Sequence, residues 1–380
     1  MDDGTGSARF VQRNYTEVLV TGDLVLDEPD ADHWLSGIAP ALRDCDLAIA
    51  HLEVPHTHSA QEVQGDIPAP GAPPENVAAI ARAGIGMVSL AGNHIADCGS
   101  AGIADTVALL DASAILHAGA GADLSRARKV AIAEADGMGI ALLSYNCVGP
   151  EFAWAGSASA GCAFLPVGTS DGSSVSPRAD LESLLPAALG ILEEDIAAAR
   201  RQADFVIVAL HQGKVHTPAH IAPYELAAAR MAVEVGADAV VAHHAHIVRG
   251  ISFHHGKPIF HGLGNGCVVT SALSPAQDHP ARAEWARARR EIFGFEPDPA
   301  YTLAPFHPEA VHAFIGRLRI DHAGNVEAGI VPVHVEAPGR PVLATGMAAR
   351  KIADYVERIT VAAGLPPISI DDTGRVEQAA

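Results

Sequence analysis

Short apolar runs alternate with longer amphipathic segments along most of the chain. The runs "TEVLVTGDLVL" (16–26), "DLAIAHLEVP" (46–55) and "GMVSLAGNH" (86–94) predict buried strands. Between the third run and the next strands, "AGIADTVALLDASA" (101–114) carries its apolar residues at helical spacing. Strands that alternate with helices in this way favour an α/β fold with parallel strand pairing.

The second half of the chain continues this alternation. Helices are predicted for "SLLPAALGILEEDIAAARRQA" (183–203) and "ELAAARMAVEVGA" (225–237), which precede the apolar strands "DFVIVALHQG" (204–213) and "DAVVAHHAHIV" (238–248). The segment "KPIFHGLGNGCVV" (257–269) predicts one more strand with a glycine-rich end. Two strands around the turn "HAGN" (322–325) and a closing amphipathic helix over 346–364 complete the pattern.

No linker divides the chain, so we expect one α/β domain over residues 16–370. Residues 1–15 are expected to form an N-terminal tail and residues 371–380 a C-terminal tail. Two stretches, 149–177 and 271–308, fit the alternation poorly and are expected to be loop excursions. Loops of this length are commonly lids or partner surfaces. Phe152, Trp154, Trp285 and Phe293 are their candidate apolar anchors for a bound peptide.

Composition excludes several classes of partner. The 380 residues include 45 acidic and 25 basic side chains, which gives a formal net charge of −20. This charge repels nucleic acid and anionic membranes, and no window approaches the ~20 apolar residues that span a bilayer. The start of the chain has no signal-peptide pattern, so we expect a cytoplasmic protein without membrane or nucleic-acid partners. The 5 cysteines lack CxxC spacing and are expected to be reduced thiols.

Polar residues with metal-ligand and acid/base chemistry stand at the ends of the predicted strands. They are Asp23, His51, Glu53, Asn93, His94, His211, His244 and His246. Each alone fits a turn, a helix cap or a polar rim equally well. Together they are significant, because parallel strands bring their carboxyl ends to one edge of a sheet. Carboxylate, amide and imidazole groups are the donors that hold a pair of divalent ions for metal-assisted hydrolysis.

Six segments in order give the chain a family resemblance: "GDLVL", "HLEVP", "GNHIADCGSAG", "ALHQGKVHTP", "VAHHAHIVRGI" and "PIFHGLGN". Together they resemble the CapA family, bacterial proteins linked to poly-γ-glutamate capsule synthesis and similar to calcineurin-like metallophosphoesterases. The likeness runs from about Val18 to Val269. It implies a four-layer α/β/β/α sandwich, the metallo-dependent phosphatase (calcineurin-like) fold, with its site at the loop edge of the sheets.

The resemblance also implies a role for each matching residue. Asp23 takes the place of the first metal-binding aspartate, Glu53 that of the second motif, and Asn93 with His94 that of the Asn-His pair. His211, His244, His246 and Asn265 match the later positions. Several positions depart from the pattern. Val25 stands where many phosphoesterases have a histidine, His51 replaces an asparagine, and "HQGKVHTP" lacks an aromatic residue and a carboxylate while introducing Lys214 and His216.

These observations leave three hypotheses for function. One is a dinuclear phosphoesterase, in which two divalent ions (Mn, Zn, Fe or Mg) are held by the ligands Asp23, Glu53, Asn93, His211, His244 and His246, and His94 donates a proton. A binding protein without catalysis, or a protein related to poly-γ-glutamate, is also compatible with the sequence. The preferred hypothesis rests on a resemblance to cytoplasmic CapA-like peptide epimerases of lasso-peptide pathways.

Under the preferred hypothesis the enzyme inverts a Cα of a ribosomal peptide by acid/base chemistry and needs no cofactor. Its partner is a peptide substrate, with or without a leader. The expected catalytic residues are Asp23, His94, His211 and His246, and the expected substrate-binding residues are His51, Asn93, Lys214 and Asn265.

Overall fold

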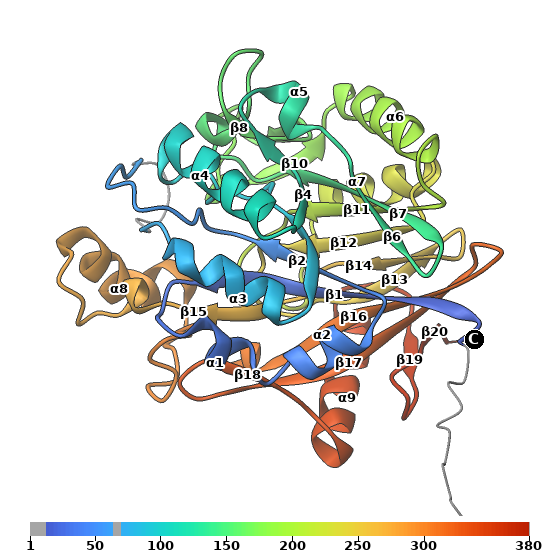
Figure 1. Ribbon diagram of the computed structural model, residues 1–380. Helices are drawn as coiled ribbons and strands as arrows, with labels where there is room; N and C mark the ends of the chain where they lie inside the picture. Colours follow the sequence, from blue (N-terminus) through green and yellow to red (C-terminus); the bar gives the residue numbers. More distant parts are fainter. Residues whose placement is uncertain (1–12, 64–69, 380) are drawn as a thin grey trace, which may run out of the picture.

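Two β-sheets packed face to face form the centre of the computed structural model, which describes residues 13–63 and 70–379 (Figure 1). Most of the expected N-terminal tail, residues 1–12, lies outside the described residues. The first sheet has the strand order β18-β17-β16-β1-β2-β3-β4, and β15 also pairs with β1. Its strands are β1 (Tyr15–Leu26), β2 (Leu47–Leu52), β3 (Ile85–Ser89), β4 (Leu116–Ala118), β15 (Asn265–Val269), β16 (His312–Asp321), β17 (Val326–Glu336) and β18 (Arg340–Leu343).

The second sheet has the order β13-β14-β12-β11-β7-β6. Its strands are β6 (Ala131–Ala135), β7 (Met138–Asn146), β11 (Phe205–His211), β12 (Ala239–His243), β13 (Ile251–His254) and β14 (Lys257–Phe260). Three small strand pairs complete the set: β5 (Ala120–Gly121) with β8 (Gly161–Cys162), β9 (Val167–Thr169) with β10 (Leu181–Leu184), and β19 (Ile368–Ile370) with β20 (Val376–Gln378). The second strand of the last pair, β20, lies within residues 371–380, which were expected to form a C-terminal tail.

Helices pack around the two sheets. They are α1 (Ala31–Leu35), α2 (Ala39–Asp44), α3 (Val77–Arg82), α4 (Gly99–Ala112), α5 (Leu124–Ala127), α6 (Ala187–Arg200), α7 (Pro223–Glu234), α8 (Pro280–Phe293) and α9 (Gly346–Ala362). α1 to α4 share a buried cluster with the first sheet, and α6 and α7 share another with the second. This order of layers confirms the predicted α/β/β/α sandwich.

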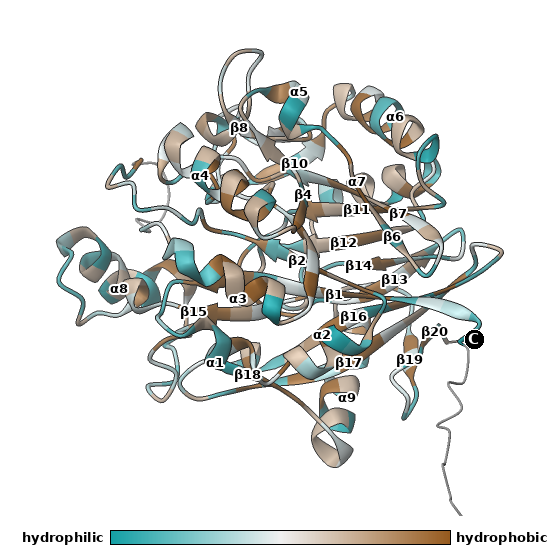
Figure 2. Cartoon of the chain, viewed as in Figure 1, coloured by the Kyte–Doolittle hydropathy of each residue, from teal (hydrophilic) through white to brown (hydrophobic). Residues whose placement is uncertain are grey.

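The period-two pattern of the strands explains why they lie between layers. In β11, Phe205 and Ile207 face the space between the sheets, whereas Val206 and Val208 face α6 and α7. All seven residues of β11 are buried. Strands buried on both faces read as nearly continuous apolar runs, which is why the brown, hydrophobic colour follows β11, β12 and β14 in Figure 2.

One strand prediction was wrong. The segment "KPIFHGLGNGCVV" was expected to form a single strand, but it forms β14 in the second sheet and β15 in the first. Residues 261–264 carry the chain between the sheets, and Gly264 adopts φ 71°, a conformation that favours glycine. Hydrophobic periodicity identifies the strand residues but carries no information about which sheet each joins.

The two excursions contain regular structure. The stretch 271–308 includes α8, which stands at one end of the molecule in Figure 1, and 149–177 includes β8 and β9. All 5 cysteines are free thiols, as expected. Over residues 13–63 and 70–379, no helix combines the length and apolarity needed to cross a bilayer.

Buried histidines make the fold sensitive to acid, and His56 is an example outside the strand-end cluster. His56 is fully buried, its Nδ1 donates to Pro73 O at 2.8 Å, and its Nε2 has no partner. Burial lowers the pKa of His56 to about 4. Between pH 6.5 and 4 the unfolded chain therefore binds a proton that the folded chain does not, and acid favours unfolding in that window.

We expect acidification from pH 7 to 4.5 to cost the wild type about 2–3 kcal/mol more of its unfolding free energy than it costs the His56→Asn variant. Asparagine can keep the donor to Pro73 O but does not take up the proton. Urea unfolding of both proteins at the two pH values measures this difference. Equal pH dependence in the two proteins would show that His56 titrates alike in both states.

Candidate metal centre

Asp23 lies inside β1, at a bulge, rather than at the tip of the strand. Its backbone N–H donates to Gly264 O at 3.0 Å, and Asn265 is its partner on β15. A Cβ on the preceding Gly22 would lie 1.9 Å from Gly264 O, so only glycine permits this approach. The glycine of the "GDL" segment thus brings Asp23 and Asn265 together.

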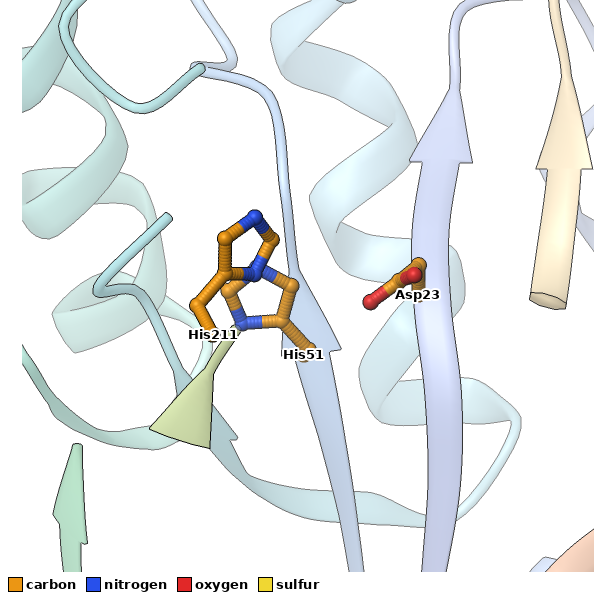
Figure 3. Close-up of side chains that lie close together, drawn as sticks. All are labelled: Asp23, His51 and His211. Carbon is orange, nitrogen blue, oxygen red and sulfur yellow. The ribbon is translucent and has the colours of Figure 1, made fainter. Parts of the chain in front are cut away.

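Three strands from both sheets converge on the same point, as Figure 3 shows for Asp23, His51 and His211. His51 is paired with Asp23 across β1 and β2. Its ring centroid lies 4.6 Å from that of His211, at the end of β11, and 4.9 Å from that of His243, at the end of β12. A Cβ on Gly92 would lie 2.9 Å from His51 Nε2, so the Gly-Asn-His turn can approach the imidazole only because it begins with glycine.

The segment "HHAH" after β12 closes the cluster in an unusual backbone conformation. His244 and His246 have φ values of 88° and 52°, in a left-handed region that such side chains rarely occupy. The backbone N–H of His244 donates to Asp23 Oδ2 at 3.3 Å, and His244 Nδ1 lies 3.1 Å from His211 Nε2. Non-glycine residues with such φ values gather at functional sites, where the surroundings hold them in place.

Hydrogen bonds tie the amides to the imidazoles. His211 Nε2 lies 2.7 Å from Asn93 Oδ1, and His246 Nδ1 lies 2.9 Å from Asn265 Oδ1. These contacts require each imidazole to donate at that nitrogen, which fixes the tautomer of the neutral His211 ring.

Charges are concentrated between Asp23, Glu53 and His246. His246 Nε2 lies 3.3 Å from Glu53 Oε1, and His246 Nδ1 lies 3.5 Å from Asp23 Oδ2. Burial alone would lower the pKa of His246, but the two carboxylates raise it to about 9. Burial, with the nearby Glu53 charge, raises the pKa of Asp23. Burial also acts to raise the pKa of Glu53, but His246 outweighs it and lowers this pKa to about 2.

The remaining imidazoles are held neutral. Burial lowers the pKa of His244 to about 3 and that of His243 to about 4, and it moves the pKa of His51 and His211 well below the usual value. Neutral imidazole is the form that ligates a metal ion.

Unpartnered atoms in this cluster match a metal centre. Buried atoms without a hydrogen bond include Asp23 Oδ1, Glu53 Oε2, His51 Nε2, His211 Nδ1 and His244 Nε2, whereas Glu53 Oε1 has its ion pair with His246. Buried polar atoms are rarely left without a partner, and here they are carboxylate oxygens and imidazole nitrogens, the atom types that ligate metal ions. Three sets have ligand atoms within 4.8 Å of one another: Asp23, His51 and His211; Glu53, His211 and His244; Asp23, Glu53 and His246. The residues present therefore fit a site for two divalent ions.

A cavity of about 620 Å³ opens beside this cluster. Glu53, Asn93 and His94 line its inner end. His94 Nδ1 lies 2.6 Å from Asp97 Oδ2, which places a carboxylate behind the imidazole. The exposed Lys214 stands on the lining as well, and the opposite wall comes from α8 and Phe306. The excursion 271–308 is thus a wall of the cavity.

Comparisons with known proteins identify the family. The model of the bacterial capsule synthesis protein family PGA_cap matches residues 13–268 of this chain. The chain belongs to this family. The predicted CapA resemblance is thereby confirmed at family level.

The PGA_cap match is supported by individual relatives. A probable polyglutamine synthesis accessory protein of Mycobacterium tuberculosis is 30% identical over 276 residues, which are 70% of this chain and 65% of that protein. The PGA biosynthesis protein CapA of Bacillus subtilis is 26% identical over 244 residues, which are 63% of this chain and 58% of that protein. The matched region spans less than two thirds of these relatives' length.

Solved structures with similar chain traces are more distant. A hypothetical protein from Thermus thermophilus has a TM-score of 0.45 and 19% identity, covering 85% of this chain and 100% of its own. A calcineurin-like phosphoesterase from Bacillus subtilis has a TM-score of 0.37 and 11% identity, covering 92% and 98%.

Most of the expected site residues of this PGA_cap member lie together. Asp23, His51, Glu53, Asn93, His211, His244, His246 and Asn265 form the contacted cluster, His94 lines the cavity beside it, and Lys214 stands exposed on the cavity wall. Trp285 and Phe293 line the cavity, whereas Trp154 stacks on Phe164 at 4.2 Å.

Sequence reasoning missed Asp97 as the partner of His94, and Arg289 on α8. Asp97 stands three residues after His94, a spacing that could have suggested a contact. Arg289 carried no sequence signal, because it sits in a run of surface-like arginines.

Proposed function

We propose that this chain is a metal-dependent hydrolase of phosphate esters, with its centre at the Asp23 cluster. The observation that carries the proposal is the set of buried carboxylate oxygens and imidazole nitrogens that have no hydrogen bond. Asp23, Glu53, Asn93, His211, His244 and His246 would hold two divalent ions (Mn, Zn, Fe or Mg). Such ions would polarise a phosphoryl oxygen and lower the pKa of a bound water.

The chain's own residues would bind the ester and move protons. His94 faces the cavity, and Asp97 behind it orients the imidazole and stabilises its charged form. We infer that His94 Nε2 donates a proton to the leaving oxygen. Asn265 would keep His246 oriented through its 2.9 Å contact, so that the ring stays beside Glu53.

A second candidate is the Cα epimerisation of a ribosomal peptide in the cytoplasm. The observation that favours it is the cavity itself, whose aromatic wall on α8 suits a peptide side chain better than a small phosphate ester. Asp23, His94, His211 and His246 would exchange the Cα proton, and His51, Asn93, Lys214 and Asn265 would bind the peptide. This reaction needs no metal ion. The relatives' names also suggest an accessory role in polyglutamine synthesis or PGA biosynthesis.

Metal content combined with activity tests the proposal. We expect protein purified without chelator, or reloaded with manganese or zinc and desalted, to hold about two ions per chain by plasma mass spectrometry. It should release 4-nitrophenol from 4-nitrophenyl phosphate, and a chelator should abolish this release. A His254→Ala variant is the matched control, because the exposed group of Glu234, His254 and His255 also has metal-ligand types but lies on the surface.

Protein that holds no metal, refuses reloading and releases no 4-nitrophenol would overturn the hydrolase proposal. Deuterium entering a peptide Cα from heavy water would then support the epimerase. If the His254→Ala variant holds fewer ions than the wild type, the ions bind at the surface group and not at the Asp23 cluster.

A further inference from the structure

Arg289 on α8 is a buried guanidinium without a counter-charge. Its side chain is only 2% exposed, and Nε, Nη1 and Nη2 all lack a hydrogen-bond acceptor. Within the described part of the chain it forms no ion pair. Burying a charge without a partner is costly, so such a group is rare unless a ligand completes it.

Two other arginines of α8 form ion pairs with nearby glutamates, so carboxylates lie within reach of this helix. Arg282 pairs with Glu62, and Arg290 pairs with Glu296 at 2.8 Å. Arg289 instead lies over the ring of Trp285 at 5.1 Å and near that of Phe306 at 5.8 Å. Aromatic faces hold the guanidinium plane in a defined orientation but accept none of its hydrogen bonds.

Two further buried nitrogens without partners line the same cavity as Arg289. Trp285 Nε1 is an N–H donor that has no acceptor, and His216 Nδ1 has no hydrogen-bond partner. Trp285 and Arg289 stand four residues apart on α8 and therefore share one face of the helix. His216 packs edge-on against Phe293 at 4.8 Å. The cavity thus has the N–H groups of Trp285 and Arg289 on its α8 wall, and Glu53 of the Asp23 cluster also lines it.

We propose that Arg289, with Trp285 Nε1 beside it, binds an oxyanion of the substrate, a carboxylate or a phosphate, at the α8 wall of the cavity. This inference rests on the proposed function, because it places the substrate's reacting group at the Asp23 cluster and its anionic group at α8. The aromatic rings around the guanidinium add an apolar contact for the part of the substrate next to the anion. The substrate class is accordingly one that carries an anion at a distance from the bond that reacts.

Binding to chelator-treated full-length protein tests this inference without any metal chemistry. The probes are phenylacetate, its uncharged analogue phenylacetamide, and inorganic phosphate, each measured by isothermal titration calorimetry. The variants are Arg289→Gln and Arg289→Lys, and Arg290→Gln on the exposed side of α8 is the matched control. Circular dichroism and the unfolding midpoint verify that each variant folds.

We expect the wild type to bind phenylacetate but not phenylacetamide, and Arg289→Gln to bind it about 10–100-fold more weakly. Arg289→Lys should be intermediate, because it keeps the charge but not the planar fork, and Arg290→Gln should match the wild type. Binding of phosphate in place of phenylacetate, with the same dependence on Arg289, would identify the anion as phosphate. Removing the unpaired charge should also raise the unfolding midpoint by a few degrees.

Wild-type protein that binds neither anion would overturn the inference. The inference would also be overturned if Arg289→Gln bound phenylacetate as tightly as the wild type. A lower unfolding midpoint of Arg289→Gln together with unchanged anion binding would assign Arg289 a structural role. Anion binding in a protein without metal-dependent turnover would overturn the proposed hydrolase and leave this site intact.

Discussion

Replacing Asp23 by asparagine is expected to lower kcat for a phosphate ester on the order of 10³-fold and to reduce the bound metal from about two ions to about one. Asparagine has the shape of aspartate and can still accept the N–H of His244, which now lies 3.3 Å from Oδ2. It loses the negative charge and one lone-pair donor, and Oδ1 is the atom that has no other partner. The fold should therefore survive while the ligand set is broken.

Asp27→Asn is the matched control for this prediction. Asp27 follows the same strand and lines the same cavity, but its Oδ2 accepts from Thr270 Oγ1 at 2.6 Å and it belongs to no ligand group among the described residues. Activity should change less than about 10-fold there. If Asp23→Asn loses activity but keeps both ions, Asp23 acts on the substrate and not on metal, which would favour the epimerase mechanism.

Hydrophobic periodicity was sufficient to predict many of the individual helices and strands of the fold. The helix expected at 101–114 is α4 at Gly99–Ala112, and the closing helix is α9. The pattern could not show that the strands divide between two sheets, because both faces of each central strand are apolar. The crossing at residues 261–264 depends on the approach of Gly22 to Gly264, a contact between segments more than 200 residues apart.

The proximity of the candidate site residues could be predicted from the sequence, whereas their roles stay predictions. Every strand-end residue selected from the sequence lies in the cluster or on the cavity wall, because parallel strands deliver their last residues to one edge. His243 was not among the selected residues, although it is 2% exposed and packs on His51. Arg289 could not be identified from the sequence, because its significance is that its buried guanidinium has no hydrogen-bond acceptor in the described structure.

The segment that carries His244 and His246 is anchored by a buried ion pair. Arg249 and Glu225 are both fully buried, with Nη1 at 2.5 Å from Oε2 and Nη2 at 3.2 Å from Oε1. Glu225 also accepts the N–H of Ala222 at 2.8 Å at the start of α7. The pair thus joins α7 to the end of the histidine segment.

We expect Arg249→Met to lower the free energy of unfolding by about 3–5 kcal/mol, because it leaves a buried carboxylate without its cation. Adding Glu225→Gln should recover most of that loss, since glutamine is uncharged and can still accept from Ala222. Urea unfolding of the four proteins in this double-mutant cycle, all metal-free, measures the coupling. Additive losses in the two single variants would show that the pair contributes no specific stability.

The same cycle separates stability from function. Because His244 and His246 hold positive φ values, they depend on their surroundings to stay at the cluster. If the anchor positions them, the folded Arg249→Met protein should bind its second ion more weakly at temperatures far below its unfolding midpoint, and the double variant should restore binding only in part. Full metal affinity in the folded single variant would show that the ion pair stabilises the fold without organising the site.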